Sequence, residues 1–193
     1  LHFGIGDAAF INESNRASNS TQASHFVQAL YALSAGALPV VIPLTNERST
    51  SALSAVNEDL VNWHGGWDSE LFVGVLLLAL VAGVTLLVKK RMRDAMDLLL
   101  LTSLALLAPP LVAFAAYFGL WHAMRHTARL TLNLKSSQKS VAENLPTRAF
   151  LQAVIPGLPA LVGTFIVSLL IGVQTPGKLS DEYLWLSLVV VWA

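Results

Sequence analysis

Val73-Gly-Val-Leu-Leu-Leu-Ala-Leu-Val-Ala-Gly-Val-Thr-Leu-Leu-Val88 is a stretch without a charged residue, and Thr85 carries its only polar side chain. Runs of roughly 18 or more apolar residues are long enough to cross a bilayer as a helix, and about 20 are typical. With its flanks the segment extends from about Glu70 to Val88, where the cluster Lys89-Lys90-Arg91 ends it. The stretch therefore predicts a transmembrane helix.

Other apolar runs predict further membrane spans. They include Leu98 to Leu120, Phe150 to Val173, and His25 to Leu44, which contains Pro39 and Pro43. Of all residues, 54% are hydrophobic and 12% are charged. Because lipid cannot satisfy backbone polar groups, a chain of this kind folds into packed helices. We therefore predict an all-α, polytopic integral membrane helical bundle of about six segments, located in the cell membrane as a multi-pass protein.

The apolar runs also predict the boundaries of the six segments. We expect them at about residues 1–11, 25–44, 70–88, 95–126, 150–173 and 184–193. Polar connections are expected at 12–24 and 130–146, and an amphipathic helix at the membrane interface is expected within 45–68. Both ends of the chain look truncated, so residues 1–193 are expected to form one membrane domain of a longer protein.

Basic residues give conflicting indications of orientation. The Lys89 to Arg93 cluster indicates a cytoplasmic connection under the positive-inside rule. However, Arg125, Arg129 and the lysines after them make the next connection basic too. A single crossing cannot join two connections on the same side. Either the Pro109-Pro110 pair makes the fourth segment irregular, or the second group of basic residues has another role.

The composition restricts the chemistry. The chain has no cysteine, so disulfides and thiolate ligands are excluded and a metal would need His, Asp or Glu. Its formal net charge is zero, which gives no indication of a nucleic-acid partner. The motifs of zinc proteases, serine hydrolases and nucleotide-binding proteins do not occur in the sequence.

Three histidines are candidate metal ligands. His122 and His126 end the long fourth segment, and residues four apart on a helix lie about 40° apart around its axis. Both imidazoles can therefore point at one metal ion. His2 also lies against apolar sequence and is predicted as a third ligand. Ionisable groups inside a membrane are functional candidates because they are expensive to keep there. The alternative is an interfacial pair of histidines bound to lipid or water.

Two charged residues accompany these histidines. Asp7 lies about 140° around a helix from His2, so the two are not expected to bind the same metal. We expect Asp7 either to accept a hydrogen bond from a ligating imidazole on another helix, which would fix its tautomer, or to pair with Arg125. Asp7 and Arg125 are therefore predicted to support the site.

Three motifs follow one another along the chain, namely His2-Phe-Gly-Ile-Gly-Asp7, Gly36-Ala-Leu-Pro-Val-Val-Ile-Pro43 and Tyr117-Phe-Gly-Leu-Trp-His122-Ala-Met-Arg-His126. Together these motifs resemble the Brp/Blh family of carotene dioxygenases. The resemblance covers most of the chain, in the same order. The resemblance implies an integral membrane, Fe(2+)-dependent enzyme that cleaves β-carotene with O2 at its central double bond. The product would be two all-trans retinal molecules, supplied to a microbial rhodopsin or a similar retinal user.

The resemblance also implies site residues. His2, His122 and His126 match three of the family's iron-binding histidines, and the fourth is expected in an HGxxD-like motif on an earlier helix. His64-Gly-Gly-Trp-Asp68 has this pattern, but it follows His2 rather than preceding it, so we interpret it as a coincidence.

The substrate would be recognised by shape. A carotene has no polar group, so the choice of double bond must come from the shape and length of an apolar tunnel. Four aromatic residues before His122 are expected to line it, namely Phe114, Tyr117, Phe118 and Trp121.

Three other functions remain open from the sequence. A di-iron lipid hydroxylase or desaturase would also use HxxxH, but it needs more paired histidines. A haem-binding membrane protein would use one histidine from each of two helices. A non-enzymatic carotenoid or retinal carrier would keep the tunnel without needing the three histidines.

Overall fold

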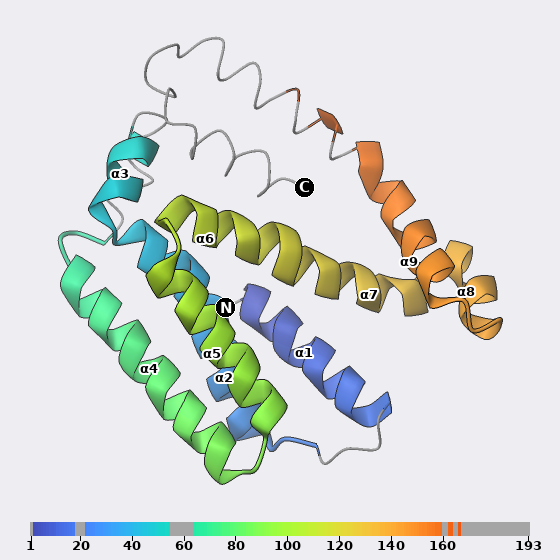
Figure 1. Ribbon diagram of the computed structural model, residues 1–193, viewed down its shortest axis with the longest axis horizontal. Helices are drawn as coiled ribbons and strands as arrows, with labels where there is room; N and C mark the ends of the chain where they lie inside the picture. Colours follow the sequence, from blue (N-terminus) through green and yellow to red (C-terminus); the bar gives the residue numbers. More distant parts are fainter. Residues whose placement is uncertain (1, 18–21, 55–63, 160–161, 164–165, 167–193) are drawn as a thin grey trace.

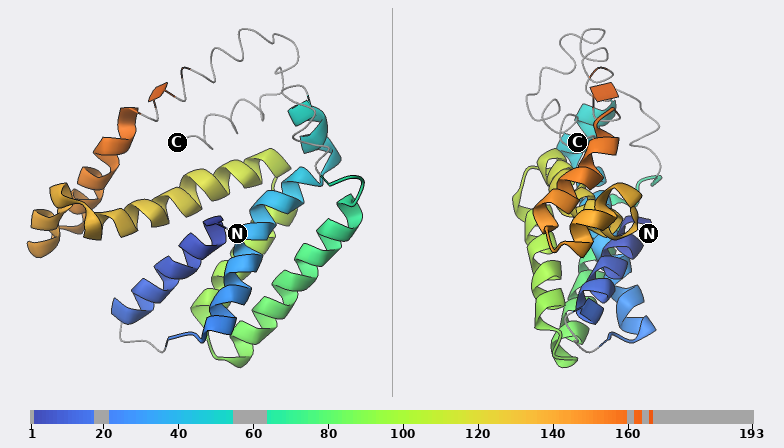
Figure 2. Two further views of the ribbon diagram at one scale, coloured as in Figure 1. Left: turned by 180° about the vertical axis from the view of Figure 1, so that it is seen from behind. Right: turned by 90° about the vertical axis from the view of Figure 1, so that its right-hand side faces the viewer.

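The computed structural model of the chain describes residues 2–17, 22–54, 64–159, 162–163 and 166. The described residues form helices and contain no strand, so the predicted all-α class is confirmed. Figures 1 and 2 show a group of helices packed around α2 and a long helical segment that crosses them. The group consists of α1 (His2–Ala17), α2 (His25–Leu44), α4 (Asp68–Val88) and α5 (Met92–Leu107).

Helix α2 is the central helix, and its predicted bounds are confirmed. Ser24 begins it, because the Ser24 hydroxyl accepts a hydrogen bond from the Val27 N–H at 3.5 Å. The helix contacts α1, α4 and α5, and it therefore buries several of its faces. Buried apolar residues occur along most of its length, for example Tyr31, Ala35 and Leu38.

Helix α4 begins just before the predicted Glu70 and ends at Val88, as predicted. One row of small and medium side chains, such as Ala79 and Ala82, is buried against its neighbours. The other sides expose large apolar side chains, as expected for a helix that contacts lipid. Within the described residues, α2 and α4 are the two helices long and apolar enough to cross a membrane. This finding supports a membrane protein, and the number of six segments stays a prediction.

The fourth predicted segment, 95–126, is not one helix. Helix α5 ends at Leu107, and Ala108 is extended with φ −80° and ψ 153°. A proline forces the residue before it out of the helical region, and it also lacks the N–H that a helix interior needs. The chain starts again at Pro110 as α6 (Pro110–Ala116), a π-helix (Tyr117–His122) and α7 (Ala123–Asn133). We call residues 110–133 the crossing helix, because it runs across α1 and α2 (Figure 1).

Two polar connections are more helical than predicted. Helix α1 continues past Ile11 to Ala17, and the predicted connection 130–146 contains the end of α7 and the short helix α8 (Lys135–Ala142). Polar residues are compatible with such helices where their short side chains bind nearby carbonyls. The buried Ser137 hydroxyl, for example, donates to the Thr131 carbonyl at 2.6 Å.

The remaining predicted elements are described in part. Helix α3 (Glu47–Ser54) occupies the start of the predicted interfacial helix, whose residues 55–63 lie outside the described part. At the start of α4, His64 Nε2 lies 3.0 Å from Asp68 Oδ1. The fifth segment begins as α9 (Pro146–Val154) and a 3-10 turn at Ile155–Gly157. The predicted sixth segment lies outside the described residues.

Gly4 determines how closely α1 approaches α2. A Cβ atom at this position would lie 1.8 Å from the Ala32 carbonyl oxygen and 2.9 Å from the Gly36 backbone nitrogen. Small residues allow helix backbones to come together in this way. Gly4 therefore holds the start of α1, with His2 and Asp7, between α2 and the crossing helix.

Candidate active site

Asp7 lies on α1 and is completely buried, with 0% of its surface exposed. A buried carboxylate needs hydrogen-bond donors to compensate for lost hydration. The Tyr117 hydroxyl donates to Asp7 Oδ2 at 2.7 Å, and His122 Nδ1 lies 3.3 Å from Asp7 Oδ1. The carboxylate therefore joins α1 to the crossing helix through two polar contacts. The expected contact between Asp7 and an imidazole on another helix is present.

The π-helix explains why Tyr117 and His122 reach the same carboxylate. In an α-helix, residues five apart point about 140° away from each other. A π-helix has i→i+5 hydrogen bonds and a wider turn, which brings such residues onto neighbouring faces. The ring centroids of Tyr117 and His122 are accordingly 6.0 Å apart. Single π-helical turns occur frequently at functional sites.

His122 and His126 share one face of the crossing helix, as their spacing predicts. Their rings are stacked, with centroids 6.3 Å apart and an angle of 15° between the planes. Gly6 makes room for His122, since a Cβ at Gly6 would lie 3.3 Å from His122 Cε1. In the neutral tautomer that donates from Nδ1 to Asp7, the Nε2 lone pair of His122 is available for a metal.

His2 lies at the start of α1, and its side chain is exposed. Its ring centroid is 5.6 Å from that of Phe3, which in turn is 5.1 Å from that of His122. One aromatic ring thus contacts both imidazoles. In the described part of the chain, no three His, Asp or Glu side chains lie close enough to hold one metal ion. The ligand set of His2, His122 and His126 stays a prediction.

Aromatic rings form a continuous wall beside His122. Phe114 and Phe118 are 4.5 Å apart between centroids, and Phe118 is 4.6 Å from Phe3. Phe114 and Phe118 are two of the predicted tunnel residues. Phe3 belongs to the same wall but comes from α1, so the row of aromatic residues on the crossing helix could not reveal it. We call Phe3, Phe114 and Phe118 the aromatic wall. It offers a hydrocarbon an apolar contact surface next to the imidazoles.

The other two predicted tunnel residues also have polar surroundings. Tyr117 is completely buried in the core, with its hydroxyl on Asp7. The Trp121 ring lies under the Arg125 guanidinium, 4.3 Å from its carbon. The Trp121 Nε1 atom is buried and has no hydrogen-bond partner among the described residues. A tunnel-lining role for Tyr117 and Trp121 stays a prediction.

Arg125 forms its ion pair with Asp97 on α5 rather than with Asp7. Its Nη2 donates to Asp97 Oδ2 at 2.7 Å, and its Nη1 donates to the Tyr31 hydroxyl at 3.4 Å. Asp97 and Tyr31 were missed by the sequence analysis, because they lie 28 and 94 residues away along the chain. Arg125 therefore links the crossing helix to α5 and α2.

Arg129 has an acidic partner as well. Its Nε and Nη2 each donate to the Glu13 carboxylate at 2.9 Å, a bidentate arrangement. These hydrogen bonds raise the pKa of Arg129 above its usual value. Arg125 and Arg129 thus form ion pairs with carboxylates of other helices. The sequence analysis left open such a role, other than marking a cytoplasmic connection, for this group of basic residues.

Comparison with known proteins identifies the family of the chain. The model of a family described as beta-carotene 15,15'-dioxygenase matches residues 1–192, which include both α1 and the crossing helix. No curated protein and no solved structure matches the chain. Because the family match extends over nearly the whole chain, the chain belongs to the beta-carotene 15,15'-dioxygenase family.

Proposed function

We propose that the protein is a membrane-bound, Fe(2+)-dependent dioxygenase that cleaves β-carotene at its central double bond into two retinal molecules. Family membership supports the reaction class. The observation that carries the proposal is the buried contact of Asp7 with His122 and Tyr117, directly beside an aromatic wall. Such a site combines an oriented imidazole with a surface for a hydrocarbon.

The donor groups suit iron. His122 and His126 would hold it together with His2, and neutral imidazoles are common ligands of this metal. When bound, iron supplies the centre that activates O2. Asp7 fixes the tautomer and the ring orientation of His122, and Tyr117 in turn holds the Asp7 carboxylate. Gly6 keeps the space beside the His122 ring free.

The aromatic wall would bind and orient the substrate. A polyene is held by apolar and aromatic contacts alone, so its position along Phe3, Phe114 and Phe118 determines which double bond lies at the histidines. The same side chains exclude water from the reacting bond. The substrate resides in lipid, which agrees with the two helices apolar enough to span a membrane. The retinal product would serve a microbial rhodopsin.

Expression of the complete protein in cells that make β-carotene tests this proposal. We expect loss of the orange colour and formation of retinal, detected by chromatography and dependent on O2. The variant with His122→Ala and His126→Ala should retain the colour. His25→Ala is the matched control, because His25 is exposed at the start of α2 and should leave activity unchanged.

Two results would contradict the proposal. Apocarotenals of unequal length would show that cleavage is not central. Unchanged β-carotene in cells that contain the folded, iron-loaded protein would show that the protein is not a carotene-cleaving enzyme.

A further inference from the structure

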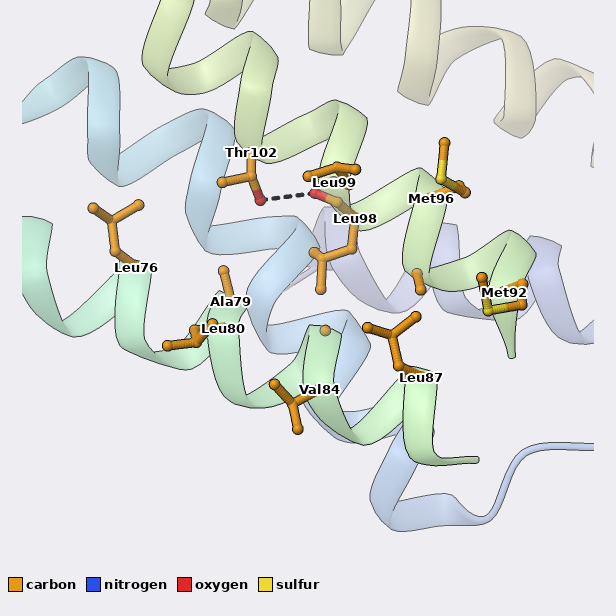
Figure 3. A pocket seen from close by; sticks show the side chains of 12 residues that line it. Leu76, Ala79, Leu80, Val84, Leu87, Met92, Met96, Leu98, Leu99 and Thr102 are labelled. Carbon is orange, nitrogen blue, oxygen red and sulfur yellow. Dashed lines mark hydrogen bonds between the residues drawn. The ribbon is translucent and has the colours of Figure 1, made fainter. Parts of the chain in front are cut away.

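Helices α4 and α5 enclose an apolar groove far from the histidines in sequence. The groove has a volume of about 400 Å³, within the range of ligand sites. It is lined from both helices, for example by Leu76, Val84 and Leu87 of α4 and by Met96 and Leu99 of α5 (Figure 3). Its one hydroxyl, that of Thr102, donates to the Leu98 carbonyl at 2.7 Å within its own helix. The groove therefore suits a hydrocarbon chain.

The length of the groove suits one leaflet of a bilayer. From Leu76 to Leu87, α4 rises by about 16 Å at 1.5 Å per residue. The hydrocarbon core of a bilayer is about 30 Å thick, so one leaflet is about 15 Å deep. An occupant that fills the groove is thus as long as one acyl chain in the membrane, and a spanning helix would extend well beyond it.

A basic turn closes one end of the groove. Leu87 and Met92 line the groove on either side of this turn (Figure 3). Lys89, Lys90 and Arg93 are exposed there, whereas Arg91 is paired with Asp94. We call Lys89, Lys90 and Arg93 the basic turn. The groove is therefore apolar along its length and has exposed cations at one end. This combination suits a negatively charged amphiphile.

The backbone conformation of Lys90 supports a functional role for the basic turn. Its φ of 56° lies in the left-handed region, where glycine is the usual residue at a helix end. The Lys90 N–H and the Arg91 N–H close the end of α4 on the Leu87 and Leu86 carbonyls, both at 2.9 Å. A glycine would make the same turn without strain. The chain instead keeps a cation beside the groove.

We propose that the α4–α5 groove binds an anionic phospholipid, with an acyl chain in the groove and the phosphate at the basic turn. The basic turn indicates a cytoplasmic connection under the positive-inside rule, and anionic lipids provide a negative surface on that side. A zwitterionic lipid would fit the groove but would lack the net charge that the basic turn attracts. This site is separate from the histidines and does not depend on the proposed reaction.

Spin-labelled lipids in nanodiscs test the proposal on the complete protein. We expect the wild-type protein to immobilise phosphatidylglycerol more strongly than phosphatidylcholine. Each cation near a membrane surface contributes about five-fold in affinity. The variant with Lys89→Gln, Lys90→Gln and Arg93→Gln should therefore lose most of this preference.

Three exposed cations on α8 and α9 provide the matched control for charge. They are Lys135, Lys139 and Arg148, and the helices α8 and α9 lie away from the turn between α4 and α5 (Figures 1 and 2). Their replacement by glutamine should leave the preference unchanged. Equal immobilisation of the two lipids by the wild-type protein, or equal losses in both triple variants, would overturn the proposal.

Single substitutions separate lipid binding from misfolding. Lys90→Gly removes the cation and relieves its backbone strain, so a folded protein with about five-fold weaker preference is expected. Asn144→Gly is its control, because Asn144 also has a positive φ of 55° but lies after α8. Unchanged preference in a folded Lys90→Gly variant would count against the site.

Two glycines of α4 test the groove itself. A Cβ would meet nothing within 4 Å at either Gly83, which lines the groove, or Gly74, which does not. Gly83→Leu should fill the groove and weaken immobilisation of phosphatidylglycerol several-fold, whereas Gly74→Leu should not. Equal effects of the two substitutions would exclude the groove as the acyl-chain site.

Discussion

At the scale of single residues, Asp7 is the group on which the candidate site depends most. It is a carboxylate without contact to solvent, and its two oxygens are used by different residues of the crossing helix. Breaking such a buried arrangement from one side leaves a charge or a donor without compensation. The consequence is a His122 ring that is oriented from α1 as well as from its own helix.

Replacing Asp7 by Asn tests this role. An amide keeps the size of the side chain but cannot hold the His122 tautomer as a carboxylate does, and losses of about 10- to 100-fold in metal affinity are typical of such changes. We expect Asp7→Asn to weaken iron retention, measured by chelator competition, less than His2→Ala does. If Asp7→Asn removed iron as completely as His2→Ala, Asp7 would be a ligand itself.

Tyr117 and Tyr31 are both buried and provide a matched pair. Tyr117 donates to a buried carboxylate at 2.7 Å, whereas Tyr31 only receives a long contact from Arg125 at 3.4 Å. Tyr117→Phe should therefore destabilise the protein by about 1–3 kcal/mol, and Tyr31→Phe should have a smaller effect. Thermal unfolding in detergent measures both. A larger loss for Tyr31→Phe would show that the hydrogen bond to Asp7 is not important for stability.

At the scale of elements, the site is formed where three helices meet. The close approach of α1 to α2 at Gly4 positions Asp7, and the π-helix turns Tyr117 and His122 toward it. Ion pairs then connect the crossing helix to α5 through Asp97 and to α1 through Glu13. The crossing helix is therefore held by the polar contacts of Asp7 and by two ion pairs.

Gly4→Ala tests the crossing of α1 and α2. The new Cβ would overlap the backbone of α2 at Ala32, and backbone atoms cannot rotate away as a side chain can. Overpacking of this kind costs about 1–3 kcal/mol or more. Gly74→Ala is the control, since it has open space and should gain up to about 1 kcal/mol of helix propensity. A Gly4→Ala protein as stable as the control would contradict the observed contact.

The two ion pairs of the crossing helix should differ in strength. Arg125 and Asp97 are less exposed, at 14% and 28%, than Arg129 and Glu13, at 32% and 42%. Water screens the second pair more, and exposed pairs contribute about 0.2–1 kcal/mol. Asp97→Asn should therefore lower the unfolding temperature more than Glu13→Gln does, and 0.5 M salt should weaken mainly the Glu13 pair. Equal losses at low and high salt would refute this ranking.

At the scale of the whole molecule, the partners of the basic residues bear on the orientation of the chain. Arg125 and Arg129 have carboxylate partners inside the protein, so they are compensated before the membrane is considered. The basic turn between α4 and α5 instead exposes Lys89, Lys90 and Arg93. Lys135, Lys139 and Arg148 are exposed after the crossing helix as well, so the orientation needs a direct test. The basic turn is expected to face the cytoplasm.

Cysteine labelling tests this orientation, and residues 1–193 add no background signal because they contain no cysteine. Ser69 and Lys89 are exposed at opposite ends of α4. If α4 spans the membrane, a membrane-impermeant maleimide added to intact cells should label Ser69→Cys and not Lys89→Cys. In permeabilised cells, the maleimide should label both variants. Labelling of both variants in intact cells would show that α4 does not cross the membrane.

The sequence by itself determined the local features of this protein. Hydropathy and turn residues predicted the helical class, the bounds of α2 and the end of α4. They could do so because a helix lies in an apolar phase only where consecutive residues along the chain are apolar. The spacing of His122 and His126 predicted their shared face, since the helical period relates residues four apart. The prolines at 109 and 110 indicated where regularity would fail.

Only the tertiary structure decided which charges and hydroxyls meet. Tyr117 lies 110 residues from Asp7, and Arg129 lies 116 residues from Glu13, so no local period relates them. The π-helix changes the register in which Tyr117 and His122 point, and its occurrence is not visible in an α-helical pattern. Burial then makes these pairings specific, because each polar group removed from water must find a partner that only the packed helices can bring to it.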